Sequence, residues 1–129
     1  MRLLEKLEEL VSKNQLAMIL SMARNEKELC KILASYLDAS YSVVIKGVEA
    51  DITADDEAVE VKLYPARFYE GFGQALALKY VAEVGKVAVI HFVKSIPGEY
   101  LNALKRLCES TGIAAAVYSE VSGLHVVKP

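Results

Sequence analysis

The chain has 129 residues, of which 53% are hydrophobic and 25% are charged, and its formal net charge is −2. This length suits one domain, and the composition excludes a disordered or collagen-like chain. The small negative charge excludes a general attraction to nucleic acids, which normally requires a basic face.

The N-terminal segment, residues 2–22, places its leucines at helical spacing, with an interruption near Asn14. We expect a helical extension here, formed by one helix or a pair. Its amphipathic, charged pattern is unlike a secretory signal, and no apolar run in the chain reaches the ~18 residues that span a membrane. Cys30 and Cys108 lie in apolar helical patterns without a CxxC partner, which favours buried, reduced thiols and a cytoplasmic protein.

A further helix is predicted at residues 26–37, with Asn25 as its N-cap. Glu26 precedes apolar residues of this helix by three, four and seven positions, so it shares their buried face, whereas Glu28 lies toward the rim. An acid at the position of Glu26 either responds to the helix dipole or points into a site. The helix pattern alone leaves both interpretations open.

Residues 41–46 are predicted to form a strand, and residues 49–62 a pair of strands joined by a tight turn at Asp55-Asp56. Apolar and charged side chains alternate in this pair, which is typical of strands with one apolar and one polar face. Six of the 17 acidic residues lie between Glu49 and Glu60, which leaves 15 basic and 11 acidic residues elsewhere. Any nucleic-acid binding is therefore expected to be local or metal-assisted.

Paired positions in this strand pair sum to 111 if the turn is centred on Asp55-Asp56. Asp51 then lies opposite Glu60, and Glu49 lies opposite Lys62, with Cβ atoms about 5 Å apart. Two carboxylates at this distance repel each other unless one is protonated or a cation lies between them. A hard divalent cation such as Mg²⁺ typically takes one or two protein carboxylates. Glu49 and Lys62 could instead form only a cross-strand ion pair.

The remaining patterns predict, in chain order, a loop at 63–67, a helix at 68–84, a strand at 86–94, a helix at 95–110 and strands at 113–118 and 124–127. Gly71 and Gly73 indicate a close approach of the helix to a ligand or strand, or a helix that begins only after Gly73. For His91, a hydrogen-bonded structural role is favoured over a role as a metal ligand or a catalytic base. His125 is expected to be exposed.

Four features together resemble the PD-(D/E)xK nuclease superfamily: an acid on a helix, an Asp on the second core strand, Glu-x-Lys on the third and a Gln on the next helix. The stretches 26–33, Asp51-Ile52 and Glu60-Val61-Lys62 look closest to archaeal Holliday-junction resolvases. The stretch 73–76, with Tyr80 behind it, is similar to the glutamine motif of RecB-type nucleases. The resemblance covers about residues 25–95. It departs from the family where Ala50 replaces the Pro and where the strongly basic surface of resolvases is missing.

The resemblance implies an α/β, restriction-endonuclease-like αβββαβ core, with a mixed central sheet flanked by helices. It implies that Asp51, Glu60 and the Val61 carbonyl bind Mg²⁺ or Mn²⁺, and that Glu26 holds a second ion or its water. Lys62 would then activate the attacking water or stabilise a pentacoordinate phosphorane, and Gln74 would orient substrate or metal-bound water. Hydrolysis of a phosphodiester needs a nucleophile made at neutral pH and relief of negative charge, which a metal and an ammonium supply.

The expected function is therefore a metal-dependent nuclease acting on DNA, including structured or junction DNA in repair or recombination. The alternative is a catalytically idle nuclease-fold module that binds a partner, which the acidic net charge and small size favour. Small-molecule binding is disfavoured because no glycine-rich phosphate loop follows the first strand. The apolar surplus favours a homodimer.

Side chains after the third core strand could contact DNA directly. Arg67 is a candidate phosphate contact, although a lone exposed Arg is usually solvated. Four aromatic residues nearby could stack on bases, although the spacing of all four favours core packing: Tyr64, Phe68, Tyr69 and Phe72. The turn at 55–57 is interpreted as a solvated acidic turn.

Overall fold

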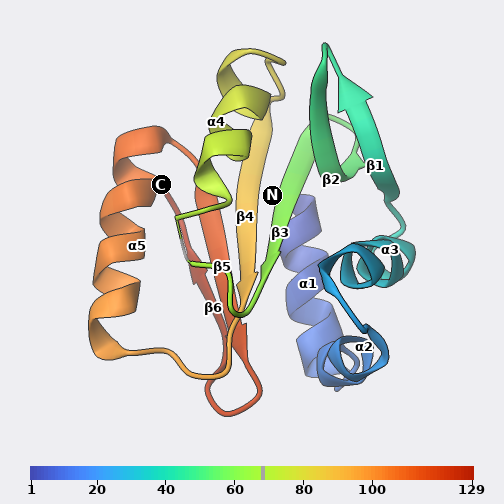
Figure 1. Cartoon of the computed structure of the whole chain (residues 1–129), viewed down its shortest axis with the longest axis vertical. Helices are drawn as coiled ribbons and strands as arrows, with labels where there is room; N and C mark the ends of the chain where they lie inside the picture. The colour runs from blue at the N-terminus through green and yellow to red at the C-terminus, as the bar shows by residue number, and fades with distance from the viewer. Residues whose placement is uncertain (68) are drawn as a thin grey trace.

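The computed structural model describes every residue of the chain except residue 68. The described residues form an α/β fold in which five helices flank a six-stranded mixed sheet (Figure 1). In chain order the elements are α1 (Arg2–Ser12), α2 (Leu16–Met22), α3 (Glu26–Tyr36), β1 (Ser40–Ile45), β2 (Val48–Ala54), β3 (Glu57–Leu63), α4 (Phe72–Tyr80), β4 (Lys86–Phe92), α5 (Gly98–Thr111), β5 (Ala114–Ser119) and β6 (Gly123–Val127).

The strands lie in the sheet in the order in which they occur in the sequence. β1, β2 and β3 are antiparallel, β3, β4 and β5 are parallel, and β6 returns antiparallel to β5. α4 and α5 make the two crossovers between parallel strands and cover one face of the sheet, because crossovers share one hand. Helices α1, α2 and α3 cover the other face (Figure 1).

Residues 57–61 of β3 are buried on both faces, although the sequence predicts one apolar and one polar face for this strand. Val59 and Val61 pack in the core under α1, α2 and α3, whereas Ala58 packs in the core under α4 and α5. Alternate residues of a strand point to opposite faces, so Glu60 shares the α4 side with Ala58. The central strand of a sheet with helices on both sides leaves no solvated face.

The N-terminal extension is a pair of helices separated near Asn14, whose φ is 56°. The first turn of α1 packs on the β2–β3 turn, where Glu57 is only 9% exposed. The expectation that all of residues 55–57 are solvated is therefore wrong for Glu57. The Glu57 carboxylate accepts the backbone N–H groups of Arg2 at 3.0 Å and Leu3 at 2.9 Å. These are unpaired donors of the first turn of α1, so Glu57 anchors that helix, while Asp55 and Asp56 are exposed as expected.

Helix α4 is shorter than the predicted 68–84, whose first residue lies outside the described residues. Gly71 is needed because a Cβ there would lie 2.8 Å from Cγ1 of Val89 and 3.3 Å from Cγ of Lys62. Gly73, by contrast, has open space around its would-be Cβ. The close approach predicted from these glycines is therefore an approach of Gly71 to β3 and β4.

The other sequence expectations concern single residues and membrane spans. Asn25 caps α3, Gly112 ends α5 with a φ of 73°, and both cysteines are free and buried. His125 is half-buried beside Val117 of β5 and not exposed as expected. None of the helices formed by the described residues is long and apolar enough to cross a membrane.

Candidate functional site

The site begins with an irregularity in the β1–β2 hairpin. The pairing omits Ser42 and Asp51, which would face each other, and Ser42 has a φ of 54°, unusual for a residue with a side chain. Ala50 packs in the core under α4, and Ile52 packs in the core under α3. Residues two apart in a regular strand share a face, so β2 turns over at Asp51.

The turnover separates β2 from β3. The β2–β3 pairing ends at Ile52 with Val59, while the β3–β4 pairing continues to Leu63 with Phe92. The residue numbers of the observed β2–β3 pairs sum to 111, as predicted from the turn, although the ladder stops one pair before Asp51 and Glu60.

Two carboxylates take the place of the missing strand partner. The N–H of Val61 donates to Oδ2 of Asp51 at 2.8 Å, and the N–H of Leu63 donates to Oε2 of Glu26 at 2.9 Å. The N–H and C=O of one strand residue point to the same neighbouring strand. The Val61 carbonyl therefore points into the gap that holds Asp51.

Glu60 is completely buried beside Asp51. Its Oε1 accepts the N–H of Asp51 at 3.4 Å, and its Oε2 has no hydrogen-bond partner among the described residues. Burial, followed by the charge of Asp51, raises the pKa of Glu60 to about 9. Glu60 therefore holds a proton at neutral pH, which is one of the two ways in which opposed carboxylates avoid repulsion.

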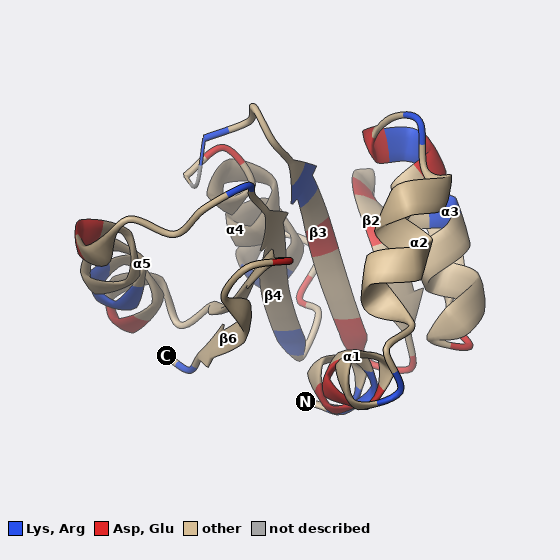
Figure 2. Ribbon diagram, turned by 90° about the horizontal axis from the view of Figure 1, so that it is seen from below, with Lys and Arg blue, Asp and Glu red and all other residues tan. Residues whose placement is uncertain are grey.

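Lys62 lies on the same face of β3 as Glu60 and reaches Glu26. Its Nζ is 3.6 Å from Oε1 of Glu26. Within the described chain it pairs with this helix residue and not with Glu49, the cross-strand partner suggested by the register. Figure 2 shows acidic residues (red) along β2 and β3 and a basic residue (blue) at the carboxyl end of β3.

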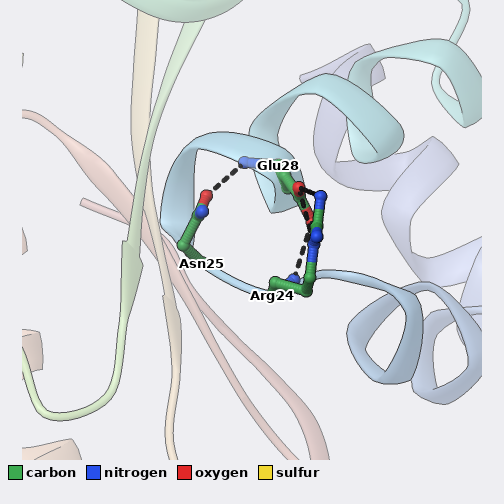
Figure 3. A network of polar contacts seen from close by, with 3 residues as sticks. All are labelled: Arg24, Asn25 and Glu28. Carbon is green, nitrogen blue, oxygen red and sulfur yellow. Dashed lines mark hydrogen bonds and ion pairs between the residues drawn. The ribbon is translucent and has the colours of Figure 1, made fainter.

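The helix phase predicted for α3 agrees with the contacts of its two acids. Glu28 forms an ion pair with Arg24 at 2.7 Å, and its backbone N–H donates the N-cap hydrogen bond to Oδ1 of Asn25 at 2.9 Å (Figure 3). Glu28 is thus engaged in the connection before α3. Glu26 alone of the two contacts β3.

Gln74 projects from α4 toward β2 and contacts its backbone. Its Nε2 donates to the backbone carbonyl of Glu49, two residues before Asp51. The structure thus brings Gln74 to the strand that carries Asp51 and not onto the carboxylates. Its contact fixes β2 just before the turnover.

The candidate DNA contacts lie in the loop that follows β3. Tyr64 is 51% exposed, with Nζ of Lys94 5.0 Å from its ring centre. Arg67 donates from Nη1 to the hydroxyl of Tyr69 at 2.8 Å. Phe72 is a buried core residue, as its spacing favoured. The same expectation is wrong for Tyr64 and Tyr69, which are both exposed, and Phe68 lies outside the described residues.

His91 is a structural histidine that anchors this loop. It is buried on β4, its Nε2 donates to the carbonyl of Ala66 at 2.7 Å, and its Nδ1 accepts from the hydroxyl of Tyr100. A carbonyl only accepts, so this pair of contacts fixes the neutral tautomer with the proton on Nε2. Burial lowers the pKa of His91, which favours that neutral form.

A pocket of about 400 Å³ opens beside Asp51, with Glu26, Glu49, Tyr41 and Ser42 in its lining. Sequence reasoning missed Tyr41 and Ser42, although a signal existed. A turn centred on Lys46-Gly47 makes the pairs of β1 and β2 sum to 93, which places Ser42 opposite Asp51.

The donor atoms around the gap fit a hard divalent cation. Within the described residues no three His, Cys, Asp or Glu side chains are arranged as a metal-binding group. Mg²⁺ needs only one or two carboxylates together with carbonyl and water oxygens. Asp51, Glu60 and the Val61 carbonyl supply such a set, and the unpartnered Oε2 of Glu60 is a buried oxygen that a cation would satisfy.

Comparison of the chain with protein-family models, curated proteins and solved structures gave no match.

Proposed function

We propose that this protein is a metal-dependent nuclease that hydrolyses phosphodiester bonds of DNA, on a restriction-endonuclease-like core. One observation carries the proposal. Where β2 leaves β3, a fully buried Glu60 lies against Asp51, with Lys62 on the same face, and one oxygen of Glu60 has no hydrogen-bond partner in the described part of the chain. Burial of an unsatisfied acid is costly for stability, and a site for a cation explains why it is kept.

Mg²⁺ or Mn²⁺, when bound, lowers the pKa of a coordinated water and neutralises charge on the phosphate. Asp51, Glu60 and the Val61 carbonyl would hold the ion. Ligation requires the ionised form of Glu60, so the proton that Glu60 carries at neutral pH leaves on binding.

Lys62 places an ammonium beside the acidic pair. A positive charge in a largely buried site stabilises negative charge that develops on a phosphate oxygen. Glu26 holds that ammonium in position through Oε1, while its Oε2 binds the backbone of the next residue of β3. Because Glu26 is held by the backbone of Leu63, it keeps the Lys62 side chain in a fixed orientation relative to β3.

The test is cleavage of labelled single-stranded, duplex and four-way-junction DNA with Mg²⁺ or Mn²⁺, with EDTA as the blank. We expect metal-dependent cleavage that Asp51→Asn and Lys62→Ala abolish and that Glu28→Gln retains. Mn²⁺ should raise the melting temperature of the wild type and of Lys62→Ala, because an ammonium is not a ligand, but not that of Asp51→Asn.

A chain that cleaves none of these substrates and shows no metal-dependent melting shift is not a metallonuclease. That result would favour the interaction module instead. The homodimer stays a prediction, which sedimentation at tens of micromolar tests: a monomer alone would contradict it.

A further inference from the structure

A second pocket, of about 570 Å³, lies beyond the carboxyl ends of β3 and β4. Its lining comes from the loop after β3, the segment after β4 and the start of α5, and it includes Tyr64, Arg67, Val93, Lys94 and Pro97. This volume is in the range of small-ligand sites. The carboxyl ends of parallel strands are a frequent position of ligand sites in α/β sheets.

The row of side chains on the α4 face of β3 leads into this pocket. The N–H of Tyr64 donates to the carbonyl of Phe92 at 2.8 Å, so strand geometry continues one residue past β3. Alternate residues share a face, which places Glu60, Lys62 and Tyr64 in one line. At about 3.3 Å per residue, Tyr64 follows Lys62 by about 7 Å.

The chemistry of the lining is aromatic and basic. Tyr64 is half exposed, and the ammonium of Lys94 lies 5.0 Å from its ring centre, while Arg67 adds a second cation at the rim. No Asp or Glu is among the described residues that line this pocket, in contrast to the pocket beside Asp51. Basic positions mark the ends of β3 and β4 and the loop after β3 in Figure 2.

Two hydrogen bonds of His91 connect the elements that form the wall of the pocket. His91, whose two ring nitrogens bind Ala66 and Tyr100, ties the loop after β3 to α5 across β4. An exposed aromatic ring beside cations is the arrangement that binds single strands, because every base offers a face for stacking and every nucleotide carries a phosphate.

We propose that this pocket binds an unpaired nucleotide of single-stranded DNA, with its base on Tyr64 and its phosphates near Lys94 and Arg67. The proposal rests on the proposed function, since it names the kind of strand that is presented to Lys62. Duplex DNA is disfavoured because its bases are stacked on one another and cannot reach the ring of Tyr64.

The test measures binding without cleavage, by fluorescence anisotropy of labelled dT12 and of a blunt 12-base-pair duplex in EDTA. We expect tighter binding of dT12. Tyr64→Ala should weaken it about tenfold, as removal of a stacking aromatic does, while Tyr64→Phe should bind like the wild type. Lys94→Ala should lower the slope of log K against log salt by about 0.7.

Two matched variants control for general effects. Tyr36→Ala removes a tyrosine that is 41% exposed at the far end of α3, and Lys86→Ala removes a lysine at the opposite end of β4. Neither should change dT12 binding. Melting curves establish that each variant is folded, and Tyr64→Phe keeps the test decisive if Tyr64→Ala unfolds.

Unchanged binding in folded Tyr64→Ala, weaker binding in Tyr64→Phe, or equal affinity for duplex and dT12 would overturn this proposal. Metal-dependent cleavage found alongside any of these results would leave the nuclease assignment intact. Tyr64-dependent binding in a protein that cleaves nothing would support the pocket and refute the nuclease.

Discussion

Glu57 and Glu60 lie three residues apart on β3, and both are buried, yet their surroundings are opposite. Glu57 meets the N-terminus of α1, where its two oxygens accept the N–H groups of Arg2 and Leu3. Glu60 meets a second acid, and its Oε2 has no partner among the described residues. One buried carboxylate completes a helix, whereas the other keeps a proton at neutral pH and leaves one oxygen without a partner among the described residues.

Glu57 and Glu60 are both buried, so burial does not distinguish the structural acid from the candidate functional one. The two differ in whether their oxygens accept hydrogen bonds. Buried polar atoms are nearly always partnered, so an exception calls for an explanation. The exception here lies where β2 turns over at Asp51 and leaves β3 without a ladder partner. The same distortion that ends the ladder brings together the oxygens that a cation would need.

The largest expected difference between the two acids is in catalysis. Glu60→Gln should lower metal-dependent cleavage by about 100- to 1000-fold or more, the usual effect of removing a group that stabilises charge in an active site. Glu57→Gln should leave cleavage close to wild type under conditions where it is folded. Initial rates with saturating Mn²⁺ measure both, and equal losses would remove the distinction.

The pH dependence of stability should come next. The pKa of Glu60 is about 9 in the folded protein and near 4.3 in an unfolded chain, so between these values the folded state binds the extra proton. The free energy of unfolding then falls as pH rises, by at most about 4 kcal/mol between pH 5 and pH 8 for this group. Urea unfolding of the metal-free protein should show the decline, and Glu60→Gln should flatten it.

Metal binding should oppose that decline. An ion that binds only the folded state adds about 2.7 kcal/mol at a hundredfold excess over its dissociation constant. Because the ligand is ionised Glu60, affinity should rise with pH up to about 9, with release of up to one proton at pH 7. Calorimetry in two buffers of different ionisation enthalpy measures the release, and none would mean that Glu60 is not a ligand.

Removal of the Glu57 carboxylate should have a smaller effect than the changes at Glu60, and it should alter only the free energy of unfolding. Glu57→Ala leaves the first N–H groups of α1 without their acceptor, and comparable cap deletions cost about 0.5–2 kcal/mol. Denaturant unfolding should show this loss with no change in the metal-induced melting shift. A changed shift would indicate that α1 and the site are coupled.

The smallest difference is expected between Glu26 and Glu28 of α3. Glu26→Gln removes the charge that orients Lys62, so we expect about a tenfold loss of cleavage, the lower end of the effect of supporting residues at metal sites. Glu28→Gln breaks an exposed ion pair with Arg24 and should not change cleavage. Equal rates in the two variants would refute the role given to Glu26.

The sequence contained most of what the site needs. The tight turn at Asp55-Asp56 and the alternation around it give the register, because pairing in a two-residue hairpin has one solution. Helix phase identified Glu26 over Glu28. These inferences succeeded because each depends only on local geometry, and the order of the elements followed from the same periodicities.

Other features depend on contacts between distant segments, which periodicity does not encode. Nothing in the residue type of Ser42 signals its positive φ, so the turnover of β2 could not be anticipated. The sequence also predicts that Asp51 and Glu60 destabilise the metal-free protein by repulsion. The burial that raises the pKa of Glu60 relieves that repulsion at neutral pH by protonation, and a gain in stability from Asp51→Asn is therefore expected only above about pH 9.

The agreement between strand order and sequence order has a consequence for folding kinetics. Every strand pairs with the strand before or after it in the chain, so the antiparallel pairings close short turns and each parallel pairing closes only one helical crossover. The β1–β2–β3 meander, closed by two-residue turns, should pair before the crossovers through α4 and α5 are complete. The segment that carries Asp51 and Glu60 is then among the first parts of the sheet to form, and mutations there should slow folding more than they speed unfolding.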